Sequence, residues 1–196
     1  MKVISRFPRV MCLMAMAATL SGLADNASAE WPAGASAASA IAEQKVHAGE
    51  PVKDVLASGI ASAADVATAV SIVAGALPCA ETGKDLVDGI KAALGAAKPE
   101  HRWAVAAAIV GAGGYSPSRQ AAFAAVVMAV SENKEESTDA VLAALPESHQ
   151  AVAVKIAVTF KGADVKQIRA AAEKHAEATG NWILSKRLVE CDTARL

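Results

Sequence analysis

The sequence predicts an all-α protein of antiparallel helix pairs with no β-sheet. Alanine, the residue with the highest helix propensity, recurs along the whole chain. Between glycine and proline breaks, apolar residues return every three or four positions, as at Leu86, Ile90 and Leu94, which places them on one helix face. No segment alternates polar and apolar residues over the length of a strand, which also favours helices.

The N-terminus has the pattern of a secretory signal. Three basic residues, Lys2, Arg6 and Arg9, precede an apolar stretch over residues 10–23, and Ala27-Ser28-Ala29 follows as a small-x-small cleavage site. The apolar stretch is shorter than the roughly 20 residues that a membrane-spanning helix needs. We therefore expect residues 1–29 to be removed, and the mature protein to be periplasmic or secreted without membrane insertion.

The rest of the chain is long enough for one helical domain. We expect residues 30–39, which are rich in Ala and Ser, to form a flexible lead, and residues 40–196 to form the domain. After cleavage, 16 basic residues stand against 19 acidic ones, without a basic cluster. Nucleic-acid binding is therefore not expected, because it needs a concentration of positive charge.

Helix breaks and caps place the elements in order. Pro51, Pro99, Pro117 and Pro146 stand at helix starts, where the missing N–H costs little. Capping-box patterns beginning at Ser62, Thr82 and Asp164 mark further starts. The predicted helices cover residues 36–48, 51–59, 62–76, 82–97, 99–112, 117–130, 135–144, 146–160, 164–178 and 182–190, so that the first overlaps the end of the lead.

The spacing of the helices leaves two architectures open. Helix pairs start near residues 63, 99, 135 and 164, a step close to that of helix-pair repeats, which stack into α-solenoids. The same spacing arises in an irregular bundle with short loops. The sequence therefore predicts either an irregular bundle or a short α-solenoid-like stack.

Two cysteines remain after cleavage of the signal, Cys79 and Cys191. An even number of cysteines in an oxidising compartment favours a disulfide, which would close a long loop here. We expect Cys79 and Cys191 to be bonded to each other.

The residues with catalytic chemistry form no recognisable motif. The four histidines lie at least 26 residues apart, so the paired spacing of a helical zinc site is absent, and we expect no metal and no cofactor. His175 shares the apolar face of its helix with Ile168, and we interpret it as a buried polar residue with a hydrogen-bond partner rather than as a ligand.

Exposed aromatic residues are the best candidates for partner binding. The turn at residues 113–119 holds Tyr115, the only tyrosine of the chain, close to Arg119, and Trp31 lies near the new N-terminus. Tyrosine, tryptophan and arginine are enriched at interface hot spots.

The function predicted from these features is that of an exported, non-enzymatic interaction or scaffold domain. Its partner would be an envelope or extracellular protein or a wall component. The alternatives are a periplasmic hydrolase acting on wall material through carboxylates from separate helices, and a carrier of a small apolar ligand. A deep polar cleft, or His175 beside acidic groups, would favour the hydrolase, and an enclosed apolar cavity would favour the carrier.

Overall fold

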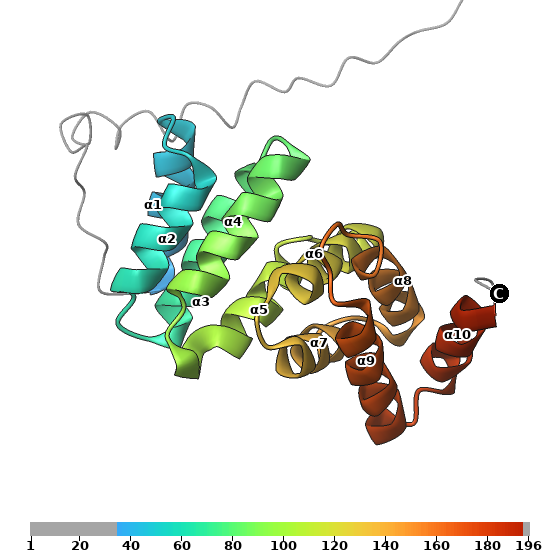
Figure 1. Ribbon diagram of the computed structural model, residues 1–196. Coiled ribbons are helices and arrows are strands. Elements are labelled where there is room, and N and C mark those ends of the chain that lie inside the picture. Colours follow the sequence, from blue (N-terminus) through green and yellow to red (C-terminus); the bar gives the residue numbers. More distant parts are fainter. Residues whose placement is uncertain (1–34, 194–196) are drawn as a thin grey trace, which may run out of the picture. The chain divides into compact units, whose positions relative to one another are not determined.

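The computed structural model describes the backbone over residues 35–193 and side chains over residues 37–189. These residues form helices and no strand, which confirms the predicted all-α class (Figure 1). The elements are α1 (Ala35–His47), α2 (Val52–Ser62), α3 (Val66–Ala76), η2 (Leu77–Cys79), α4 (Gly83–Ala96), η3 (Pro99–His101), α5 (Arg102–Gly111), α6 (Pro117–Val130), α7 (Lys134–Ala143), α8 (Glu147–Ala157), α9 (Val165–Thr179) and α10 (Trp182–Thr193).

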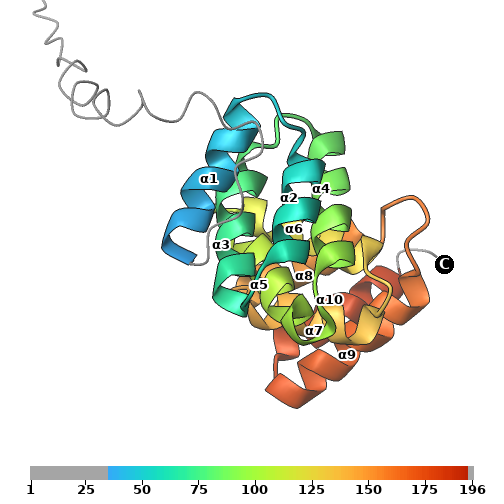
Figure 2. The same cartoon turned by 90° about the vertical axis from the view of Figure 1, so that its left-hand side faces the viewer.

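The helices are arranged in two layers. From α1 to α10, each helix contacts the helix two positions further along the chain, so that odd-numbered helices form one layer and even-numbered helices the other. Figures 1 and 2 both show α1 beside α3 and α2 beside α4. Among the described helices, every extensive contact joins elements close in sequence. Of the two predicted architectures, this pattern matches the α-solenoid-like stack of helix pairs.

One junction in the even-numbered layer is less extensive than the others. The contact of α4 with α6 is smaller than that of α2 with α4 or of α6 with α8. The turn that follows α6 lies against this junction, together with the start of α5. The layer is therefore less tightly packed near its middle.

The helix starts follow the predicted caps, with one correction. The side chains of Thr82 and Asp164 accept hydrogen bonds from backbone N–H groups three residues later, as N-caps do. Ser62 does not open a helix, because α2 continues to it and its hydroxyl donates to the Ser58 carbonyl at 2.8 Å. Asp65 is the N-cap of α3 instead and accepts from the Thr68 N–H at 2.7 Å, which lowers the pKa of Asp65.

Helix α1 begins at Ala35, one residue before the predicted helix over residues 36–48, and covers the end of the predicted lead. Residues 35–39 were expected to belong to a flexible lead, but they are helical, and Ala38 is completely buried. Small residues allow a close approach of α1 to α3. A Cβ atom on Gly75 would lie 2.1 Å from the backbone oxygen of Ser39, so only glycine fits at this crossing. Residues 1–34, which carry the predicted signal and the start of the lead, lie outside the described residues.

The core is apolar and alanine-rich, with one buried polar chain near its C-terminal end. Gln150 on α8 donates to the carbonyl of Leu142 at 2.8 Å, and its own side-chain oxygen accepts from Asn181 at 2.8 Å. The other side-chain atom of Asn181 accepts from the Leu184 N–H at 3.1 Å and so caps α10. Gln150 and Asn181 are both almost completely buried. These hydrogen bonds hold the start of α10 against α8 and join α8 to α7.

Candidate functional site

The most exposed cluster of large apolar side chains lies on α10. Trp182 and Val189 are 69 % and 64 % exposed, and Ile183 is exposed as well. Trp182, Lys186 and Val189 follow at intervals of four and three residues and therefore share one helix face. We call Trp182, Ile183, Lys186 and Val189 the α10 face. The opposite side of α10 packs against the body of the protein through Leu184 and Leu188.

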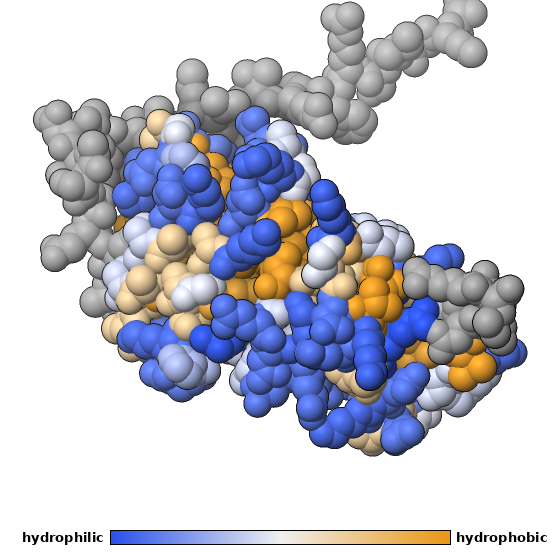
Figure 3. Space-filling model, in the orientation of Figure 1, coloured by the Kyte–Doolittle hydropathy of each residue, from blue (hydrophilic) through white to orange (hydrophobic). Residues whose placement is uncertain are grey.

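The α10 face carries one cation of its own, Lys186. Val152 and Lys155 are exposed on α8, the neighbour of α10 in the even-numbered layer. Figure 3 shows apolar surface on α10 next to hydrophilic surface. Exposed tryptophan beside cationic residues is typical of surfaces that bind other proteins.

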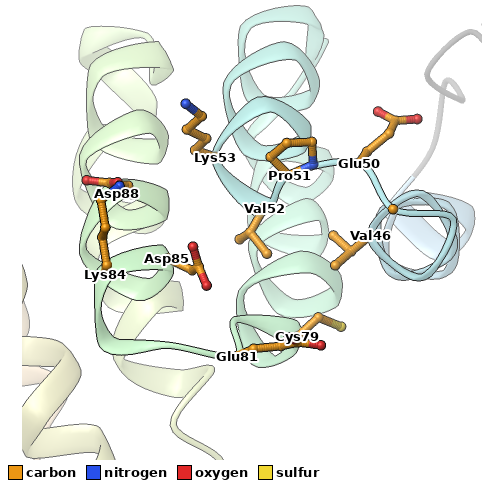
Figure 4. A pocket seen from close by; sticks show the side chains of 11 residues that line it. Val46, Glu50, Pro51, Val52, Lys53, Cys79, Glu81, Lys84, Asp85 and Asp88 are labelled. Carbon is orange, nitrogen blue, oxygen red and sulfur yellow. The ribbon is translucent and has the colours of Figure 1, made fainter.

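A pocket of about 340 Å³ lies between the α1–α2 turn and the start of α4 (Figure 4). Its charged residues are largely paired with neighbours in the sequence. Lys84 donates to Asp88 at 2.6 Å on the same helix, which lowers the pKa of Asp88 and raises that of Lys84. Asp85 accepts from the Thr82 hydroxyl at 2.6 Å. Glu50 and Glu81 also line the pocket, and Glu50 accepts from Lys45 at 3.0 Å.

Cys79 lines this pocket as a free thiol. Its sulfur lies 4.0 Å from Nε2 of His47, but burial and the nearby Glu43 carboxylate raise the pKa of the thiol. A reactive cysteine requires the thiolate, which this environment disfavours. The group is therefore a poor nucleophile.

The structure gives no support to the predicted disulfide between Cys79 and Cys191. Cys79 belongs to η2, which contacts α1 to α4, whereas Cys191 belongs to α10, which contacts α8 and α9. Figure 1 shows α10 at the other end of the stack from α1 to α4. A disulfide requires Cα atoms within about 7 Å of each other. The side chain of Cys191 lies outside the described residues.

His175 is buried and lies beside an acidic group. Its Nδ1 is 2.7 Å from a carboxylate oxygen of Asp139, which is mostly exposed. Its Nε2 is buried and has no hydrogen-bond partner among the described residues. A histidine that acts as a general base must present a nitrogen to the substrate. Neither the pocket at the start of α4 nor the one between α4 and the end of α6 is lined by His175 or Asp139.

The turn between α5 and α6 places Tyr115 in solvent, where it is fully exposed. Gly114 adopts a positive φ of 67°, and its carbonyl accepts from the Gln120 side chain at 2.7 Å, which fixes the turn. The Arg119 guanidinium lies over the ring of Phe123, 5.3 Å from its centroid. Arg119 therefore packs on its own helix, whereas Tyr115 is available to a partner. Trp31, the third predicted binding residue, lies outside the described residues.

Comparison with family models, with curated proteins and with solved structures found no match. The function must therefore be argued from the chain itself. Over the described part of the chain, no group of three or more His, Cys, Asp and Glu side chains could hold a metal ion. No helix in that part is both long enough and apolar enough to cross a membrane.

Sequence reasoning missed the α10 face, although its signal is present. Trp182 was placed at the start of the last helix, but only the structure shows that Leu184 and Leu188 fill the buried side of α10 and leave Trp182 and Val189 outside. The five large apolar residues of α10 (Trp182, Ile183, Leu184, Leu188 and Val189) spread over more of the helix surface than a single buried stripe. A comparison of their positions with the width of one buried stripe would have indicated that some of them are exposed.

Proposed function

We propose that this chain is an exported helical interaction module, periplasmic or secreted, which binds another protein of the bacterial envelope or extracellular space through the α10 face and catalyses no reaction. The observation that carries the proposal is the exposure of Trp182 and Val189 on the last described helix of a two-layer stack. Large exposed apolar patches in soluble proteins mark interaction sites.

The geometry of the stack favours a helix as the occupant. Each even-numbered helix before α10 packs against the next one in its layer, and among the described residues α10 has only α8 and α9 as extensive neighbours. Lys186 within the face favours acidic residues on that partner. We propose an amphipathic helix with apolar and acidic residues as the element that is bound.

The binding proposal is tested with two charged variants of exposed apolar residues. Trp182→Glu places a carboxylate in the α10 face, whereas Val66→Glu changes an exposed apolar residue away from that face, at the start of α3. We expect proteins captured from an envelope extract by the unaltered protein and by V66E to be lost with W182E, because hot-spot tryptophans contribute about 2 kcal/mol or more. A carbodiimide cross-linker, which joins amines to carboxylates directly, should link Lys186 to an Asp or Glu of a partner helix.

Two results would contradict this assignment. One is equal capture by W182E and the unaltered protein, with both variants folded by circular dichroism. The other is that Lys186 cross-links only to the chain's own carboxylates while capture proceeds, since the partner would then bind elsewhere.

Export is supported by the N-terminal pattern and predicts a shortened product. We expect the protein recovered from the periplasm or medium of a bacterial host to begin at Glu30, because the small side chains of Ala27 and Ala29 fit signal peptidase. N-terminal sequencing with intact mass measurement checks this. A product that begins at Met1 in the cytosolic fraction would refute export.

The mass of the non-reduced protein also tests the state of the two thiols. A mass two daltons below that of the reduced chain would show that Cys79 and Cys191 are bonded after all.

A further inference from the structure

A second pocket, of about 330 Å³, lies where the even-numbered layer is least tightly packed, between α4 and the end of α6. Its walls are apolar in part, through Leu94 and Val130, and its charged residues are Lys91, Arg102 and Glu132. This volume is at the lower end of the range for small-molecule pockets, about 300–1,000 Å³. The site differs from the α10 face in every residue.

The Arg102 side chain forms no direct hydrogen bond or ion pair within the described part of the protein. Its Nε atom is buried and lacks a hydrogen-bond partner there, and the guanidinium forms no ion pair with any described side chain. Arg102 as a whole is only partly buried and lines the pocket, so an anion inside the pocket would be attracted to its positive charge. Arg102 is also the first residue of α5, where the positive end of the helix dipole disfavours a cation. An anion in the pocket would offset the positive charge at this helix start.

The composition of the pocket defines the kind of anion. Two cations, Lys91 and Arg102, face one carboxylate, that of Glu132, which leaves one positive charge to be balanced. A guanidinium binds a carboxylate through two parallel hydrogen bonds. The apolar walls at Leu94 and Val130 suit a hydrocarbon portion of the ligand.

We propose that this pocket binds a small organic monoanion whose carboxylate pairs with Arg102 and whose short apolar tail lies against Leu94 and Val130. Lys91 at the rim adds attraction, and Glu132 selects against ligands with two negative charges. The inference does not depend on the partner proposed for the α10 face.

The test is calorimetric titration of the purified protein with hexanoate, octanoate, octanol and octyl phosphate. We expect octanoate to bind more tightly than hexanoate, by up to about fourfold for each added methylene group. Octanol and octyl phosphate should bind more weakly than octanoate. Arg102→Gln should weaken octanoate binding about 10-fold or more, because a charge-assisted pair is lost. Lys53→Gln, which removes a cation from the other pocket, should leave it unchanged.

A gain of binding provides a test that does not depend on the folding of the arginine variant. Glu132→Gln removes the opposing carboxylate from an exposed position and should tighten octanoate binding several-fold. The proposal is overturned if octanol binds as tightly as octanoate, or if no octanoate binding is detected at millimolar concentration. It is also overturned if Glu132→Gln weakens octanoate binding, or if folded Arg102→Gln binds octanoate as the unaltered protein does.

Discussion

Alanine at Gly75 is expected to destabilise the protein, whereas alanine at Gly95 is expected to stabilise it. Both glycines are helical, and in a helix alanine is favoured over glycine by about 1 kcal/mol. At Gly95 the new Cβ meets no atom within 4 Å, so this gain is kept. At Gly75 it would lie 2.1 Å from the backbone oxygen of Ser39, so α1 must move away from α3. Overpacking of this kind costs about 1–3 kcal/mol and sometimes more.

Chemical denaturation of the two variants measures these opposite shifts, and hydrogen exchange locates them. We expect faster exchange within α1 in G75A, because α1 packs mainly on α3, and unchanged exchange there in G95A. If both variants were stabilised equally, the close crossing of α1 and α3 would be incorrect.

Asn181→Ala should lower the free energy of unfolding by about 2–4 kcal/mol, the largest effect that we expect from a single polar residue. The substitution removes the cap of α10 and leaves the buried side-chain oxygen of Gln150 without a donor. A cap alone contributes about 1 kcal/mol, and an unsatisfied buried acceptor adds about 1–3 kcal/mol. The change is measured by urea denaturation followed by circular dichroism.

Asn133→Ala is the matched control, because Asn133 caps α7 through the Glu136 N–H in an exposed position. We expect it to cost only the cap, about 1 kcal/mol. Equal losses in the two variants would mean that the bond between Asn181 and Gln150 contributes nothing, and that α10 is held by Leu184 and Leu188 alone.

The helices could be predicted because the residues that start and end each helix lie next to it in the sequence. Prolines at helix starts and the caps Thr82 and Asp164 act within four residues, so the pattern needs no knowledge of the fold. The Ser62 box was misread for the same reason. Ser62 and Asp65 have the spacing of a capping box, and only the continuation of α2 to Ser62 shows that Asp65 is itself the cap.

The candidate sites were harder to predict because they join distant parts of the chain. Asp139 and His175 meet across α7 and α9, and nothing near either residue indicates the other. The second pocket brings Lys91, Arg102 and Glu132 together from three segments. Tyr115 was predicted as a binding residue from its type and its turn, but exposure alone does not show that a partner uses it.

The two-layer arrangement affects how the protein folds and where it unfolds locally. Since extensive contacts among the described helices join only near neighbours in sequence, the contact order is low, and folding can nucleate at several places and spread outward. Helices at the ends of such an array have neighbours on one side and fray first. A ligand bound to α10 would therefore suppress the fraying of that helix. Its affinity could be measured from the decrease in the rate of proteolysis within α10.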